Sequence, residues 1–91
     1  MTSRRVTVTG RVQGVGFRWF VRAAAETAGV SGWVRNRRDG TVEAELHGSA
    51  DAVSQVTAAL RRGPHHARVE HLAIEEIPET DAAGFEILST L

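Results

Sequence analysis

The sequence predicts an α+β sandwich, in which two helices cover one face of an antiparallel sheet. Three observations predict it. Four segments are predicted as strands, and the clearest of them, residues 5–12, alternates apolar and polar residues as a strand buried on one face does. Two further segments repeat their apolar residues at the 3.6-residue spacing of a helix. The segments follow one another as strand, helix, strand, strand, helix and strand, and two helices are too few to cover both faces of such a sheet.

The first strand and the first helix meet at a glycine-rich stretch. Residues 5–12 place their valines on one face, and arginines and threonines on the other. From residue 17 the spacing of the apolar residues becomes helical. The apolar side of this helix consists of Phe17, Phe20, Val21, Ala24 and Ala28. We expect Gly29 to cap the end of this helix. We expect Trp19, on the outer side, to pack at the helix edge rather than to face a ligand.

A β-hairpin is predicted next. Residues 31–36 and 41–48 are its strands, and Asp39-Gly40 between them is a strong turn signal. The inward-facing residues of the second strand are Val42, Ala44 and Leu46. Arginines on the hairpin could form a phosphate or nucleic-acid patch. We expect a solvated rim instead, because neighbouring carboxylates offset their charge.

The second helix is predicted to begin at a serine cap. Ser49 precedes it, and Gly63-Pro64 ends it after about Arg62. Its apolar side consists of Val53, Val56 and Leu60.

The last predicted strands are less regular. Residues 68–77 place Leu72 and Ile74 inward, whereas Val69 and Ile77 fall in the other frame, which indicates a bulge or an edge strand. Residues 85–87 form a short final strand. The order βαββαβ, with both helices on one face, is that of a ferredoxin-like sandwich.

Composition limits the classes of function. The 91 residues suffice for one domain, 1–91, and 42% hydrophobic with 24% charged residues is typical of a globular protein. The formal net charge is zero, so no overall field favours nucleic acid or a membrane. The chain has no cysteine, which excludes disulfides and thiolate metal sites and favours a reducing compartment. No apolar run could act as a signal peptide or a membrane span. We therefore expect a cytoplasmic protein, and a monomer, since no long apolar surface demands a partner.

Residues 10–18, Gly-Arg-Val-Gln-Gly-Val-Gly-Phe-Arg, carry the strongest functional signal. Gly14 and Gly16 can adopt left-handed backbone angles, which turn successive N–H groups into a concave nest for an anion. The helix N-terminus that follows adds free donors, and Arg18 adds a fork that fits two phosphate oxygens. A dinucleotide fingerprint would need a third glycine where Trp19 stands, and a Walker A loop would need a lysine, which the chain lacks.

Other polar residues offer little for ordinary catalysis. The four histidines have no cysteine partner and no helical His-x-x-x-His spacing, so we expect solvated loop histidines rather than metal ligands. No serine has a histidine beside it in the sequence, so nothing supports a nucleophilic triad. The carboxylates fall on the outer faces of the strands at 41–48 and 68–77, where we expect them to be solvated.

Two signatures resemble those of the acylphosphatase family. Residues 10–18 match its first signature, Gly-x-Val-Gln-Gly-Val-x-Phe/Tyr-Arg. Residues 32–36, Gly-Trp-Val-Arg-Asn, followed by Gly40 and a strand, match its second. The resemblance extends over essentially the whole chain.

This resemblance implies hydrolysis of acyl phosphates to a carboxylate and inorganic phosphate, without a metal or other cofactor. Arg18 matches the family's phosphate-binding arginine, and Asn36 matches the asparagine that positions the attacking water. The backbone N–H groups that match its phosphate loop are those of Gln13, Gly14, Val15, Gly16, Phe17 and Arg18. The partner is then a small-molecule acyl phosphate, but the sequence does not say which acyl group it carries.

Three other functions fit parts of the pattern. A module that binds phosphate without turnover would keep the nest, although it would not need Asn36. An RNA-binding domain of the same fold would stack bases on aromatic residues of the sheet, and the outer faces of the strands at 5–12 and 41–48 have none. Specialisation for carbamoyl phosphate is known from a related domain that begins much larger chains.

Overall fold

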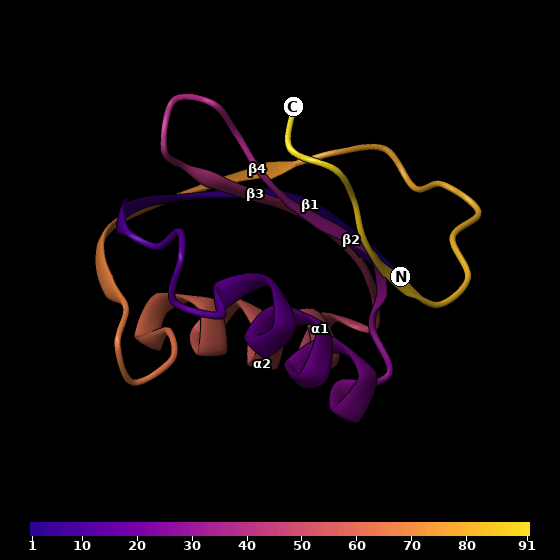
Figure 1. The fold of residues 1–91 in the computed structure, drawn as a ribbon. Coiled ribbons are helices and arrows are strands. Elements are labelled where there is room, and N and C mark those ends of the chain that lie inside the picture. The colour runs from indigo at the N-terminus through magenta and orange to yellow at the C-terminus, as the bar shows by residue number, and fades with distance from the viewer.

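The structure is a computed structural model that describes all 91 residues, and it places two helices against one face of a five-stranded sheet (Figure 1). The elements are β1 (Thr2–Arg11), α1 (Phe17–Ala28), β2 (Ser31–Asn36), β3 (Val42–Gly48), α2 (Ala50–Arg62), β4 (Arg68–Glu76) and β5 (Phe85–Ile87). The strand order across the sheet is β4-β1-β3-β2-β5. The predicted ferredoxin-like sandwich is therefore confirmed, as are the two helices and the hairpin between β2 and β3.

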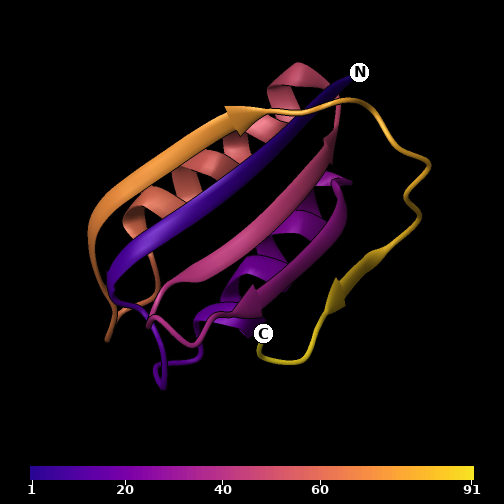
Figure 2. The same ribbon diagram turned by 90° about the horizontal axis from the view of Figure 1, so that it is seen from above.

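Strand pairing differs from the prediction at one edge. The first four strands pair antiparallel, as expected, but β5 lies parallel to β2. A chain segment crosses from β4, at one edge of the sheet, to β5 at the other, so β5 enters the sheet in the same direction as β2 (Figure 2). The segment that follows β5 reaches the end of β2, where the C-terminus lies.

The hydrophobic core lies between the sheet and the helices. The inward positions predicted for β1 and β3 are almost fully buried, and α1 contributes Phe17, Val21 and Ala25. Ala24, which the helical wheel placed inward, is only half-buried. α1 packs against β2 and β5, and α2 packs against β1, β3 and β4, so each helix covers one part of the sheet.

Local sequence explains the element boundaries. The Ser49 hydroxyl accepts a hydrogen bond from the Ala52 N–H at 3.1 Å, which is the predicted cap of α2. Gly29 ends α1 with a φ of 75°. β4 is an edge strand, and its pairing with β1 shifts register between Thr9 and Gly10, so both explanations for its irregular pattern hold. Ile74 lies opposite the buried Val6, on the inward face as predicted, but it remains 43% exposed because β4 is at the edge of the sheet.

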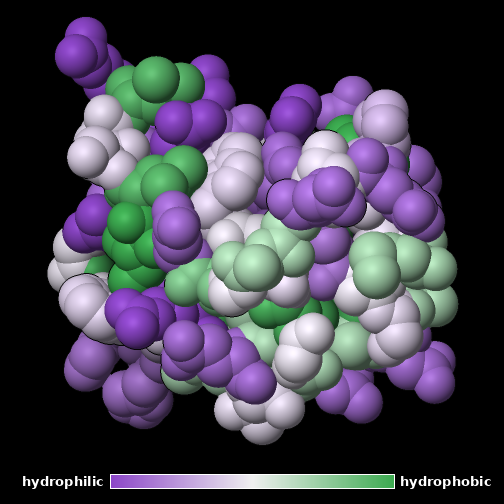
Figure 3. Space-filling model, turned by 90° about the vertical axis from the view of Figure 1, so that its right-hand side faces the viewer, coloured by the Kyte–Doolittle hydropathy of each residue, from purple (hydrophilic) through white to green (hydrophobic).

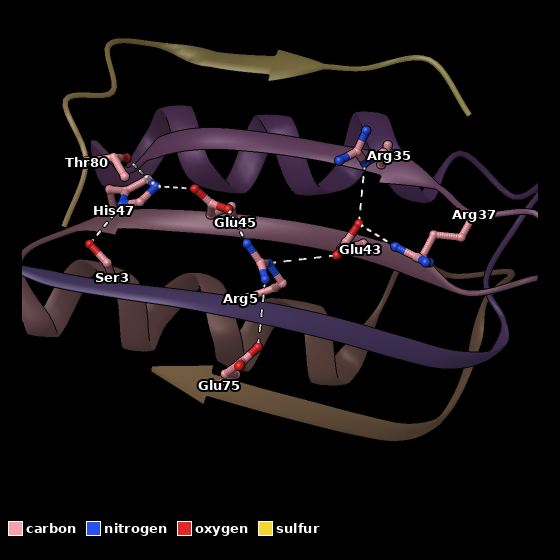
Figure 4. A network of polar contacts seen from close by, with 9 residues as sticks. All are labelled: Ser3, Arg5, Arg35, Arg37, Glu43, Glu45, His47, Glu75 and Thr80. Atoms are coloured by element: carbon pink, nitrogen blue, oxygen red, sulfur yellow. Dashed lines mark hydrogen bonds and ion pairs between the residues drawn. The ribbon is translucent and has the colours of Figure 1, made fainter. Parts of the chain in front are cut away.

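The outer face of the sheet carries a polar network in which carboxylates offset the hairpin arginines, as predicted, but are far more buried than expected (Figure 4). Glu43 and Glu45 on β3 were expected to be solvated, but their side chains are only 11% and 13% exposed. The arginine side chains of the neighbouring strands cover them: Arg5 approaches both carboxylates, at 3.8 Å and 3.1 Å. Glu43 also forms ion pairs with Arg35 and Arg37, at 3.4 Å and 3.0 Å.

No helix is long and apolar enough to cross a membrane.

Candidate active site

The segment expected to bind phosphate, residues 13–18 (the phosphate loop), runs from the end of β1 into the first turn of α1. Gly14 and Gly16 have φ angles of 73° and 77°, and no non-glycine residue has a positive φ, so φ changes sign twice across Gly14, Val15 and Gly16. Such an alternation turns neighbouring N–H groups toward a common point. No atom lies within 4 Å of the position that a Cβ would take on either glycine. Glycine is therefore required at these two positions by backbone angle, and the space beside the loop is open.

The N–H groups of this loop have no acceptors within the chain. Gly16 is the N-cap of α1 and offers no side chain to accept from the first turn. The first loop-to-helix hydrogen bond runs from the Phe20 N–H to the Gly16 carbonyl at 3.1 Å, and none is donated by the backbone of residues 13–16. Phe17 and Arg18 are the first two residues of α1, whose N–H groups have no partner within a helix. This end of α1 thus presents unpaired donors at the positive end of the helix dipole.

Arg18 lies half-buried in the first turn of α1. Its guanidinium takes part in none of the ion pairs of the structure, which engage other arginines: Arg4, Arg5, Arg22, Arg35 and Arg37. The charge of Arg18 is therefore not neutralised by a carboxylate. An arginine beside unpaired N–H groups is suited to bind an oxyanion through two of its oxygens.

Asn36 is the last residue of β2. It shares a face with the buried Val34, so its side chain lies on the side of the sheet that the helices cover. Its Oδ1 atom is buried and accepts no hydrogen bond. A buried carbonyl oxygen without a donor is costly unless water or a ligand satisfies it. The Leu91 N–H donates to the Asn36 carbonyl at 3.1 Å, so the segment after β5 holds the backbone at this position.

The side chain of Gln13 connects the phosphate loop to the β2–β3 hairpin. Its amide nitrogen donates to the carbonyl of Arg37 at 2.7 Å and to the carbonyl of Thr41 at 2.9 Å. The sequence assigned Gln13 only a backbone role. Its side-chain partners are 24 and 28 residues away, so no local pattern could have found this connection.

The hairpin that receives Gln13 is itself closed by hydrogen bonds. The Asp39 carboxylate accepts from the hydroxyl of Thr41 at 2.6 Å and from its N–H at 2.9 Å. These bonds lower the pKa of Asp39 below its ordinary value of 3.8, the hydroxyl having the larger effect. Because the pKa is lower in the folded state, this contribution to stability is present above the ordinary pKa and is lost as the pH falls through the folded-state pKa.

Two cavities open on the surface, and neither includes a residue of the phosphate loop or Asn36. One, of about 330 Å³, lies between α1 and α2 and is lined largely by alanines. The other, of about 480 Å³, lies beside the crossover from β4 to β5 and is lined by Ser31, His47, Glu79, Thr80 and Asp81, among others. Figure 3 shows this side of the molecule, where hydrophobic residues form separate patches among hydrophilic ones. The exposed Gly14 and Gly16 have open space beside them, so the phosphate loop faces solvent rather than a cavity.

His47 differs most from its prediction. It lies on β3, within the strand predicted at 41–48, but it was expected to be solvated and is only 4% exposed. Its Nδ1 lies 2.8 Å from the Ser3 hydroxyl, and its Nε2 lies 3.0 Å from Glu45 and 3.3 Å from Thr80 (Figure 4). Serine, histidine and glutamate are the residue types of a nucleophilic triad. However, Ser3 is 4% exposed and does not line the cavity, so this cluster holds the crossover to the sheet and gives a substrate no access to the Ser3 oxygen.

Trp19 is more exposed than the sequence predicted. Trp19 was expected to pack at the helix edge, but it is 63% exposed, and the guanidinium of Arg22 lies 5.5 Å from its ring. No group of three or more His, Cys, Asp or Glu side chains gathers in a way that could hold a metal ion.

Comparison with known proteins agrees with the fold and the motifs. The model of the family described as Acylphosphatase matches residues 4–87. An acylphosphatase of Rhodopseudomonas palustris is 50% identical over an alignment that covers 97% of this chain and 95% of that relative. The acylphosphatase structure from Bacillus subtilis superposes with a TM-score of 0.93 at 36% identity, covering 97% of this chain and 99% of that one. The structure from Coxiella burnetii superposes at 0.92 with 40% identity, covering 96% and 92%.

The fold is thus the ferredoxin-like α+β sandwich, with a glycine-rich loop of unpaired backbone donors at the start of its first helix. The match to the family model and the sequence identity to curated relatives establish which family has this fold and this loop here. The chain belongs to the acylphosphatase family.

Proposed function

We propose that this chain hydrolyses acyl phosphates to a carboxylate and inorganic phosphate, with Arg18 and the phosphate loop holding the phosphate and Asn36 orienting the attacking water. Hydrolysis of acyl phosphates is the activity of the family to which the chain belongs. The observation that carries the assignment of roles is the buried Oδ1 of Asn36, which has no donor within the chain and which a water bound beside it would satisfy. The Gln13 side chain links the hairpin that follows Asn36 to the loop, whose N–H groups are unpaired.

The roles follow from the chemistry of the substrate. Water attacks phosphorus, the bond between phosphorus and the acyl oxygen breaks, and the carboxylate that leaves is stable without protonation. A general acid is therefore unnecessary, and catalysis consists mainly of positioning and charge stabilisation. The loop N–H groups and Arg18 stabilise the charge that spreads over the phosphoryl oxygens in the transition state. An amide oxygen orients water but takes no proton, so the phosphate of the substrate receives it.

Fast hydrolysis of a simple acyl phosphate such as acetyl phosphate is expected from the purified protein in an excess of chelator. The roles assigned above involve no metal, so adding a divalent cation afterwards should not raise the rate. The release of inorganic phosphate is the measurement. Phosphate binding without any hydrolysis would instead support the non-catalytic phosphate-binding module, and a rate that depends on added metal would contradict the division of roles.

Turnover of bound substrate is expected to change little between mildly acidic and neutral pH. A guanidinium stays charged over this range and an amide does not titrate, so neither proposed catalytic group changes its protonation. The measurement is kcat as a function of pH at saturating acetyl phosphate. A sharp bell-shaped profile would indicate a general base outside the proposed site.

The proposal includes the domain organisation, the compartment and the oligomeric state of the protein. A single hydrophobic core supports one domain over residues 1–91. We propose a cytoplasmic monomer that binds no nucleic acid. The absence of cysteine and the zero formal net charge support this setting.

A further inference from the structure

Gln13 occupies an unusual place between the two halves of the site. It begins the phosphate loop, yet its side chain turns away to the base of the β2–β3 hairpin. That hairpin starts at Arg37, the residue directly after Asn36. One side chain therefore connects the loop proposed to hold the phosphate with the residue proposed to hold the water.

The connection uses the full donor capacity of one amide group. An NH₂ group has two protons, and the Gln13 nitrogen has two acceptors, the carbonyls of Arg37 at 2.7 Å and Thr41 at 2.9 Å. The opposite orientation of the amide would place its oxygen against the same two carbonyls, which repel it. The two acceptors thus fix the orientation of this amide and leave it no proton for a ligand.

The two acceptors belong to a turn of the hairpin that several other hydrogen bonds close. The Arg37 carbonyl also accepts from the Gly40 N–H at 3.1 Å, and the Thr41 carbonyl also accepts from the Arg37 N–H at 2.9 Å. Asp39 closes the same turn through Thr41. Gln13 therefore fastens the loop to a rigid turn, where a shift of the amide would break bonds on both sides.

We propose that the Gln13 side chain is a positioning residue, which sets the separation between the phosphate loop and Asn36 so that water is held in line with the phosphorus. This inference rests on the proposed function. Gln13 touches neither the reacting atoms nor the phosphate through its side chain. Its effect passes through the hairpin to Asn36. Misplacement of a reacting group by about 1 Å can cost on the order of 10²-fold in rate, so such a connection matters for turnover more than for phosphate binding.

Gln13→Met tests this, because methionine keeps the length of the side chain and removes both donors. We expect kcat for acetyl phosphate to fall roughly 10- to 100-fold. We expect inhibition by inorganic phosphate to change little, because the loop N–H groups and Arg18 remain. Gln13→Asn keeps the donors on a side chain one methylene shorter. Its kcat should lie between those of the wild type and Gln13→Met. Hydrogen exchange of the amides of residues 37–41 should become faster in both variants, a readout that does not depend on activity.

A double-mutant cycle separates positioning from simple loss of stability. If Gln13 acts through Asn36, then Gln13→Met should cost little further rate when Asn36 is already alanine. Equal rate losses in both backgrounds would overturn the proposal. So would a wild-type kcat in Gln13→Met, or loss of phosphate inhibition in parallel with kcat.

Thr57→Val is a matched control for these variants. It removes a side-chain hydrogen bond to backbone, from the Thr57 hydroxyl to the Val53 carbonyl at 2.7 Å, within α2 and away from the site. It should lower the melting temperature without changing kcat. Should Gln13→Met unfold at the assay temperature, Gln13→Asn and the cycle built on it carry the same test. The wild type is measured in the same assay, so a wild type that hydrolyses no acyl phosphate would contradict the proposed function rather than the role of Gln13.

Discussion

Replacing Arg18 with alanine is expected to lower the rate of acyl phosphate hydrolysis by roughly 10³- to 10⁵-fold, or about 4–7 kcal/mol of transition-state stabilisation. Arg18 is free of ion pairs and sits in the first turn of α1, beside N–H groups that have no acceptor. The variant removes the planar charge at the start of α1, while the backbone donors stay. The measurement is kcat/KM for acetyl phosphate, with folding checked by circular dichroism.

Two further variants make the expected result specific to this arginine. Arg22→Ala is the matched control, because Arg22 lies one turn later on the same helix and pairs with Glu26 at 3.4 Å on the exposed surface. It should keep the wild-type rate. Arg18→Lys should be nearly as poor as Arg18→Ala, since an ammonium group cannot make the forked contact to two oxygens. A lysine variant with most of the wild-type activity would mean that Arg18 supplies charge alone.

The regular elements could be predicted from the sequence because each has strong local signals. β1, β3 and α2 combine a clear hydrophobic period with a turn or cap residue, and their inward residues are those expected. The phosphate loop was also predictable in shape, since only glycine adopts the angles of Gly14 and Gly16 without strain. These features depend on residues close together in the chain.

The features that the sequence did not reveal depend on distant residues. β5 has three residues, and their sequence does not indicate that they pair parallel with β2. His47 stands in the outward frame of β3, where a polar residue is normally solvated, but Ser3 and Thr80 enclose it. The Gln13 side chain depends likewise on carbonyls of the hairpin. A one-dimensional pattern gives the face on which a side chain lies, but not what the rest of the chain places there.

Asn36→Ala is expected to lower kcat by about 10²- to 10³-fold, by analogy with the loss of one preorganised hydrogen-bonding group in an active site. The variant removes the buried Oδ1, which has no partner within the chain and for which we propose the attacking water as the donor. Binding of the phosphate should change much less, because Arg18 and the loop N–H groups are untouched. Turnover and inhibition by inorganic phosphate must therefore be measured on the same preparation.

Whether Asn36→Ala changes turnover, phosphate inhibition or both decides the role of Asn36. Gln55→Ala is the control for loss of an amide, because Gln55 is exposed on α2 and should alter neither quantity. If Asn36→Ala weakened phosphate inhibition and kcat to the same degree, Asn36 would bind the phosphate rather than the water. If it abolished phosphate binding and left turnover at saturation intact, the proposed roles of the loop and the hairpin would be reversed. A fall in kcat alone would place the attacking water at the end of β2, on the side of the sheet that α1 covers.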